Sequence, residues 1–174
     1  MFAHCLQVVS TYGTAYPTLQ PRITKTLVGA LLDFSKPLTT HYGAIRGLCA
    51  MGEAARSALV FANLSVYVPF LQSAREDGTA LRKKEAAHVW SLLLQQCLAH
   101  VKGVLAQQEA FVKQLAETAD GKDGRGAGKR GREEVPAHPA VTATIPLVKQ
   151  FRETFGAAAF DKAAREEKVD LSLF

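Results

Sequence analysis

The feature that most constrains the fold is a series of apolar residues spaced three and four positions apart, the spacing of one face of an α-helix. Such stripes recur in residues 19–34, 38–51, 64–71, 79–118 and 141–160. The first of them consists of Leu19, Ile23, Leu27, Ala30, Leu31 and Phe34. No run of alternating β-branched residues bounded by turn signals occurs between them, so the sequence predicts an all-α fold.

Proline and glycine residues divide the first stripes into pairs of helices. Lys36-Pro37 is expected to end the first helix, because a proline disfavours helical geometry in the residue before it. Gly52 is expected to stop the second helix, and Asp77-Gly78 separates the helices of a second pair. Helices joined by such short turns lie antiparallel.

The two helix pairs are similar to each other at a fixed separation. Leu19 aligns with Leu64, and Ala44 aligns with Ala87, at separations of 45 and 43 residues. These separations lie within the roughly 40–47-residue period of HEAT and armadillo repeats. We therefore predict a HEAT-repeat α-solenoid of antiparallel helix pairs, with an irregular helical bundle as the alternative.

The solenoid is expected to occupy residues 1–118. Residues 119–139 are rich in Gly, Lys and Arg and predict a disordered loop, and residues 140–174 predict C-terminal helices that pack on the solenoid or extend it. A single helix over residues 79–118 would be about 60 Å long, too long for one repeat. We therefore predict a break or bend at Gly103, because glycine inside a helix costs about 1 kcal/mol relative to alanine.

The net charge of +5 comes mostly from one segment. Residues 121–132 hold five basic residues and one acid, so any weak, nonspecific contact with nucleic acid is expected to depend on this loop alone. Within it, Lys129, Arg130 and Arg132 fit the basic core of a nuclear-import signal, and an ordinary solvated charge run is the alternative. No apolar run reaches the roughly 18 residues of a membrane span, which predicts a soluble chain with no membrane contact.

Residues with chemical potential are few. The three cysteines are widely separated, which predicts no disulfide framework and favours a reducing compartment. Cys97 and His100 lie one helical turn apart, as two zinc ligands would, but a closed structural site needs four ligands, so we favour a core cysteine beside a boundary histidine. The glycine-rich loop lacks the spacing of a P-loop. We expect no catalytic activity, no metal and no cofactor.

Residues 41–48, His41-Tyr42-Gly43-Ala44-Ile45-Arg46-Gly47-Leu48, differ most from ordinary helix sequence. Two glycines inside one helix cost about 2 kcal/mol relative to alanine, so a compensating contact is expected. Gly43 and Gly47 are four residues apart and would let another helix approach closely; a ligand contact is the alternative. With Tyr42, and with Pro21 in the first turn of the preceding helix, they form a predicted helix-packing signature.

The same region resembles a known family. The order and spacing of the segments Leu19-Gln20-Pro21-Arg22-Ile23-Thr24-Lys25-Thr26-Leu27, Leu32-Asp33, Lys36-Pro37-Leu38-Thr39 and residues 41–48 are similar to the C-terminal HEAT-repeat domain of the TFIID subunit 6 family. The resemblance is strong over about residues 5–52 and looser to about residue 118. It implies a nuclear scaffold module for assembly of the RNA polymerase II pre-initiation complex, within TFIID or a SAGA-type coactivator.

The resemblance also implies partners. Family members contact large TFIID scaffold subunits such as 1 and 8 through this domain, whereas pairing with subunit 9 uses an N-terminal histone fold that this sequence lacks, so we expect a fragment of a longer protein. Arg22, Lys25, His41 and Arg46 are the predicted partner contacts, because they are polar and lie in the similar segments. The alternatives are a free-standing HEAT-like adaptor outside transcription and, third, a DNA-binding module that uses the basic loop.

Overall fold

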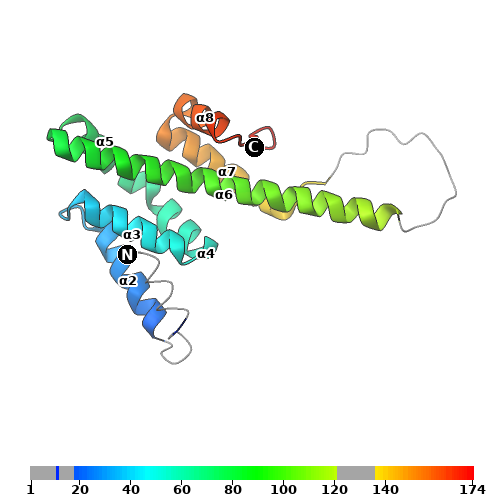
Figure 1. The fold of residues 1–174 in the computed structure, drawn as a ribbon, viewed down its shortest axis with the longest axis horizontal. Helices are drawn as coiled ribbons and strands as arrows, with labels where there is room; N and C mark the ends of the chain where they lie inside the picture. Colours follow the sequence, from blue (N-terminus) through cyan, green and yellow to red (C-terminus); the bar gives the residue numbers. More distant parts are fainter. Residues whose placement is uncertain (1–10, 12–17, 121–135) are drawn as a thin grey trace. The chain divides into compact units, whose positions relative to one another are not determined.

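The structure, a computed structural model, describes residue 11 and residues 18–120 and 136–174. Every regular element in these ranges is helical and none is a strand, which confirms the predicted all-α class. The chain forms two compact units, Met1–Cys97 and Leu98–Phe174. The division falls inside the long helix α6, Ala80–Asp120, so each unit contains part of it (Figure 1).

The first unit begins with a pair of helices that pack on each other, α2 (Leu19–Leu32) and α3 (Leu38–Ala50). In the turn between them, the Asp33 carboxylate accepts hydrogen bonds from the Ser35 N–H at 3.2 Å and the Ser35 hydroxyl at 2.5 Å. Lys36 forms an ion pair with the same carboxylate at 3.4 Å. The expected stop at Gly52 is confirmed by its φ of +109°, a conformation that favours glycine.

A continuous helical segment follows, with α4 (Glu53–Ala55), a π-helical turn η1 (Arg56–Val60), a 3₁₀ turn η2 (Phe61–Asn63) and α5 (Leu64–Glu76). The sequence predicted only its last part. These 24 residues are long and apolar enough to span a membrane, with a mean hydropathy of 1.4 in the most apolar window. Phe61, Leu64 and Leu71 of this segment are buried within the first unit, and 33% of the most apolar window is buried in all.

The helix α5 is tied to the first part of α6. The guanidinium carbon of Arg75 lies 4.4 Å from the centroid of the Trp90 ring, a cation–π contact. Thr79 begins the turn into α6, where its hydroxyl accepts a hydrogen bond from the Arg82 N–H at 3.3 Å. The expected break at Asp77-Gly78 is therefore confirmed.

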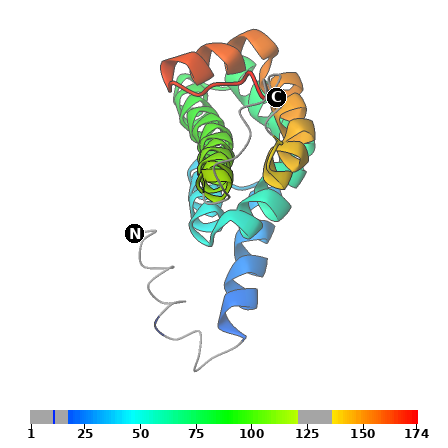
Figure 2. The same ribbon diagram turned by 90° about the vertical axis from the view of Figure 1, so that its right-hand side faces the viewer.

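The second unit contains the rest of α6, α7 (Pro139–Phe155) and α8 (Ala157–Glu166). Figure 2 shows α8 turning sharply from the end of α7. Gly156 separates the two helices with a φ of +85°, a conformation that favours glycine. Side chains that these two helices bury are Val141, Thr144, Val148, Phe151, Phe155, Phe160 and Ala164.

Within the predicted stripe of residues 141–160, the sequence pattern placed Ile145 on the apolar face, and this placement is wrong. Ile145 is 44% exposed, whereas Thr144 is 3% exposed. Positions 141, 144, 148, 151 and 155 follow the helical spacing of three and four residues, and position 145 lies one step around the helix from that face. Thr144 therefore occupies the core position despite its hydroxyl group.

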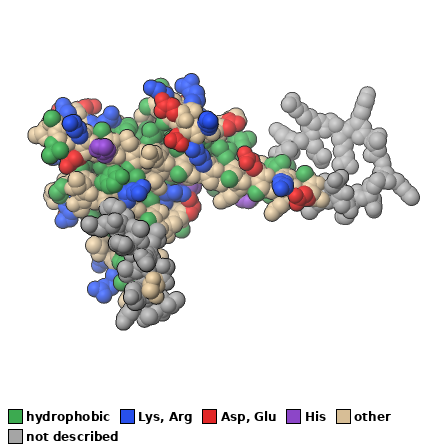
Figure 3. Space-filling view, in the orientation of Figure 1, with side chains coloured by type: hydrophobic (Ala, Val, Ile, Leu, Met, Phe, Trp, Pro, Cys, Tyr) green, Lys and Arg blue, Asp and Glu red, His purple; other side chains and the backbone are tan. Residues whose placement is uncertain are grey.

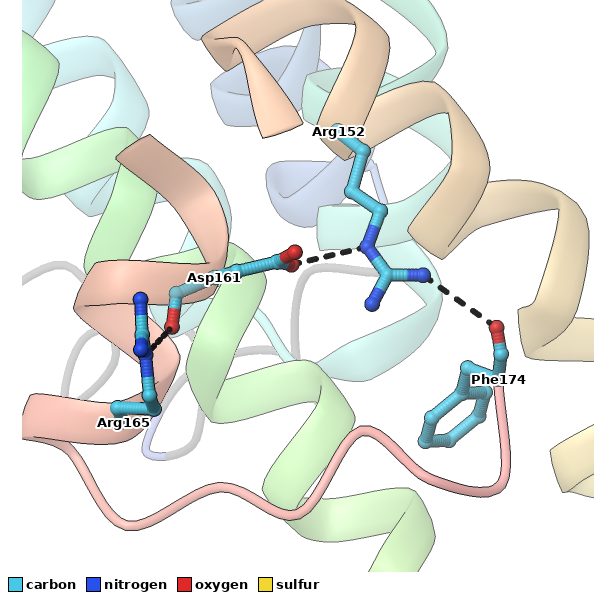
Figure 4. Close-up of polar contacts among 4 residues, drawn as sticks. All are labelled: Arg152, Asp161, Arg165 and Phe174. Carbon is cyan, nitrogen blue, oxygen red and sulfur yellow. Dashed lines mark hydrogen bonds and ion pairs between the residues drawn. The ribbon is translucent and has the colours of Figure 1, made fainter. Parts of the chain in front are cut away.

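Arg152 joins three segments of the second unit (Figure 4). Its Nε donates to an Asp161 carboxylate oxygen at 2.9 Å, and its Nη1 donates to the carbonyl oxygen of Phe174 at 3.4 Å. Arg165 Nε donates to the backbone carbonyl of Asp161 at 3.3 Å. Arg152 thus ties α7 to α8 and to the final residues of the chain.

A second polar anchor fixes the start of α7. The His138 N–H donates to the Gln108 side-chain oxygen at 2.5 Å, and the Gln108 amide nitrogen donates to the Pro136 carbonyl at 3.4 Å. The His138 ring then caps the helix by accepting the Ala140 N–H at 3.1 Å. A largely buried glutamine of α6 therefore sets where α7 begins.

The predicted break at Gly103 is wrong, because α6 continues from Ala80 to Asp120. Gly103 is exposed, and a Cβ atom placed there would meet nothing within 4 Å. Its neighbours Val101 and Val104 are buried. Their burial outweighs the roughly 1 kcal/mol cost of one helical glycine.

The Gly103→Ala variant should therefore be more stable than the wild type by about 0.5–1 kcal/mol, because alanine loses less backbone entropy in a helix and has room here. Urea unfolding followed by circular dichroism measures the change. The matched control is Gly156→Ala in the same unit, where the positive φ should make alanine destabilising by at least about 1 kcal/mol. A destabilised Gly103→Ala chain would show that α6 needs a bend at this position.

Candidate partner-contact surface

The first helix pair is positioned by a close approach at Gly47. A Cβ atom at this residue would lie 2.9 Å from Leu27 Cδ1 of α2, closer than real Cβ contacts come. Gly47 is buried and Gly43, one turn earlier, is half-buried. The glycine on α3 thus makes room for a leucine of α2, which compensates its helical cost.

An aromatic cluster of Phe34, His41, Tyr67 and Phe70 joins this pair to α5. The Phe34 and Phe70 rings stack with centroids 4.7 Å apart, and His41 lies 5.5 Å from both Tyr67 and Phe70. Tyr67 is almost fully buried, and burial raises the pKa of its phenol well above the ordinary value. Tyr67 and Phe70 have the spacing of any apolar helix face on α5, so no feature of the sequence distinguishes them.

His41 lies inside this cluster and not on the surface. It has 0% exposure, and neither ring nitrogen has a hydrogen-bond partner. Burial lowers the pKa of His41, and this effect outweighs nearby backbone groups of Leu31, Asp33 and Lys36, which act to raise it. A side chain held here as a neutral ring cannot reach a partner protein, so we remove His41 from the predicted partner contacts.

The other three predicted contacts are exposed. Arg22 and Lys25 project from α2, and Arg46 projects from α3. Two shallow grooves flank α2, each with one of these cations at its edge. Their lining residues are Leu19, Arg22, Ile23, Thr26 and Leu27 for a groove of about 410 Å³, and Gln20, Pro21, Thr24, Lys25 and Val28 for one of about 580 Å³.

The remaining residues of the predicted packing signature lie at the edges of the pair. Pro21 is exposed in the first turn of α2, where its missing N–H breaks no hydrogen bond, and it lines one of the grooves. Tyr42 is half-buried on α3. The loop residues Lys129, Arg130 and Arg132 lie outside the described residues.

Cys97 and His100 occupy core positions, and Cys49 is half-buried. Cys97 has 0% exposure and His100 has 7%. Burial raises the pKa of the Cys97 thiol well above its ordinary value and raises the pKa of Cys49 to about 11. Thiols in this state are poor nucleophiles at neutral pH.

A pocket that the sequence did not predict lies between α3 and the first part of α6. It has a volume of about 470 Å³ and is lined by Leu38, Thr39, Tyr42, Glu85 and His88. Figure 3 shows hydrophobic side chains gathered between these two helices. The lining residues of α3 and those of α6 are more than 40 positions apart in the sequence, so no local motif marks the pocket.

The segment that contains α2 and α3 is similar to known proteins. Residues 3–65 match the family described as the TAF6 C-terminal HEAT repeat domain. Transcription initiation factor TFIID subunit 6 of Arabidopsis thaliana is 43% identical over 90 residues, which cover 50% of this chain. The predicted resemblance to TFIID subunit 6 is confirmed.

Two further proteins are similar to this chain. The SAGA complex/transcription factor TFIID complex subunit Taf6 of Schizosaccharomyces pombe is 45% identical over 71 residues, which cover 41% of this chain. The TAF6-like RNA polymerase II p300/CBP-associated factor-associated factor 65 kDa subunit 6L of Mus musculus is 28% identical over 131 residues, which cover 72% of this chain. The match spans only 16% of the Arabidopsis and fission-yeast proteins and 20% of the mouse protein. No solved structure matches significantly.

The matched TAF6 segment contains the contact that positions α2 on α3, and its packing can be tested. Gly47→Val should destabilise the chain by about 1–3 kcal/mol, because the new side chain collides with Leu27. Urea unfolding gives the change. Adding Leu27→Ala should recover part of the loss, whereas Gly29→Ala, with nothing within 4 Å, should not destabilise. A Gly47→Val chain of wild-type stability would contradict the close approach.

His41 gives the first unit of this TAF6-like chain a pH dependence with a defined sign. Its pKa is lower in the folded chain than the ordinary 6.5, so the unfolded chain binds the proton more readily. The free energy of unfolding is therefore unaffected by His41 above about pH 6.5, and it decreases as the pH falls below 6.5. Urea midpoints at about pH 7.5 and about pH 5.5 measure the loss.

The His41→Phe variant should lose less stability over this pH range than the wild type, because its ring takes no proton. His88→Phe serves as the control, since His88 is exposed and should leave the wild-type pH dependence in place. Equal pH dependence in the wild type and His41→Phe would show that His41 is not the titrating group.

Proposed function

We propose that the chain is a structural module of TFIID that supports assembly of the RNA polymerase II pre-initiation complex through protein–protein contacts, and that it also serves SAGA-type coactivators. The observation that carries the proposal is the match of residues 3–65 to the TAF6 C-terminal HEAT repeat domain. Both complexes appear in the name of the fission-yeast relative. None of the relatives compared favours an adaptor outside transcription.

The proposal includes no catalytic step. The relatives are named as transcription factor subunits. The two cysteines in the described part of the chain have raised pKa values, which disfavour the reactive thiolate. In that same part, no group of three or more His, Cys, Asp or Glu side chains could hold a metal ion.

The charge of the first helix pair supports a contact with an acidic partner. Neither α2 nor α3 contains an Asp or Glu residue, while Arg22, Lys25 and Arg46 are all exposed. The grooves beside α2 add apolar surface between the charges. Apolar surface with cations at its edge fits a partner helix that has apolar and acidic faces.

The resemblance to the TFIID subunit 6 family extends the proposal to the partners of the chain and to its location in the cell. The partners are large TFIID scaffold subunits such as 1 and 8, and the location is the nucleus. Pairing with subunit 9 is not part of the proposal. The basic residues Lys129, Arg130 and Arg132 remain a candidate import signal, and any nucleic-acid contact remains assigned to their loop.

The double variant Arg22→Glu, Lys25→Glu tests the surface. Purification of the tagged chain from nuclear extract should recover at least about tenfold less of the other TFIID subunits than the wild type, because like charges now face each other. Quantitative mass spectrometry measures the recovery.

The matched control is Lys149→Glu, Lys162→Glu, which reverses two exposed lysines of the second unit and should leave recovery unchanged. Unfolding curves of both variants test that the fold persists. Unchanged recovery with the α2 variant would remove Arg22 and Lys25 from the interface. A wild-type chain that recovers no TFIID or SAGA subunit would contradict the function itself.

A further inference from the structure

We propose that the pocket between α3 and α6 receives an arginine side chain of a partner protein, flanked by apolar residues. The inference deepens the proposed function, since it rests on the chain acting through protein contacts. The pocket volume of about 470 Å³ lies within the range of roughly 300–1,000 Å³ typical of sites that hold a ligand group. All five lining side chains belong to the first unit.

The charge of the pocket selects a cation. Glu85 is its one acidic lining residue, is half-buried, and forms no ion pair with any residue in the described ranges. Arg82, one turn earlier on α6, lies instead over the Phe70 ring at 5.9 Å. A half-buried carboxylate beside apolar surface gains more from an incoming cation than a fully solvated one does.

The shape and chemistry of the other walls favour arginine over lysine. Leu38 is buried and gives the lining an apolar surface, and the half-buried Tyr42 offers an aromatic ring. A planar guanidinium can pair with a carboxylate and stack on an aromatic face together, whereas an ammonium is a compact, strongly hydrated charge. The aliphatic stem of arginine would cover this apolar surface.

Two further lining residues have hydrogen-bonding groups that a guanidinium could use. The Thr39 hydroxyl and the His88 ring line the pocket, and within the described ranges neither side chain bonds to another residue. A guanidinium has five N–H donors, more than one carboxylate can accept. Leu81, one turn before Glu85 on α6, is 68% exposed and offers apolar contact to a residue beside the arginine.

The test uses the 174-residue chain and two synthetic peptides, N-acetyl-Leu-Arg-Leu-amide and its twin with citrulline in place of arginine. Citrulline has nearly the same shape but no charge. In ¹H–¹⁵N NMR titrations, the arginine peptide should shift the amide signals of residues 38–42 and 85–88 and bind about fivefold more tightly than the citrulline peptide.

The Glu85→Gln variant should reduce the affinity for the arginine peptide by about fivefold, to that of the citrulline peptide. Glu109→Gln, an exposed acid on the same helix, is the control and should leave the affinity unchanged. Equal affinity for both peptides, an unaffected Glu85→Gln variant, shifts confined to α2, or no binding up to about 10 mM would each overturn the proposal. Because the peptides are independent of TFIID, such a failure leaves the co-purification result standing, and the reverse also holds.

Discussion

The first unit depends on the aromatic cluster that joins one helix pair to the next. Phe34 and His41 come from the first pair, Tyr67 and Phe70 come from α5, and their rings lie 4.7–6.4 Å apart. Aromatic pairs at such distances contribute about 0.5–1.5 kcal/mol each beyond the area they bury. The contribution requires a neutral His41, because an imidazolium ion without a partner would be costly there. The packing of the repeats therefore fixes a protonation state as well as a geometry.

The same packing decides which residues of the TAF6-like segment remain available to partners. Residues 41–48 form successive turns of α3. The helical period therefore directs some of their side chains into the core and others to the surface. His41 and Gly47 face the interior, Tyr42 lies at the edge beside the α3–α6 pocket, and Arg46 is exposed. A single short motif thus holds residues that build the unit and residues that face solvent. Similarity to a family over this motif therefore does not distinguish the residues that pack the core from the residues that face solvent.

The sequence predicted the helices wherever periodicity and turn residues agreed. Pro37, Gly52 and Gly156 all mark observed helix ends, because their backbone restrictions act locally. The prediction was wrong at Gly103, where buried valines on both sides outweigh one glycine. It missed the π and 3₁₀ turns of residues 56–63, since no local signal specifies them. His41 was assigned to the surface because polarity alone was considered, and the pocket was missed because Glu85 and His88 meet α3 only through tertiary contact.

The extent of the family match differs from the extent of the folded unit. The match to the TAF6 C-terminal HEAT repeat domain ends at residue 65, just inside α5, whereas the similarity to the mouse relative extends over 131 residues and the first compact unit continues to Cys97. The buried side chains of Tyr67, Val68, Leu71 and Leu93 all lie beyond the match. A chain that ended at residue 65 would leave Phe34 and His41 without the rings they contact, and an exposed apolar face of this kind must be covered by another chain. Residues 66–97 therefore close the core of the first unit, and they also contribute Glu85 and His88 to the pocket on its surface.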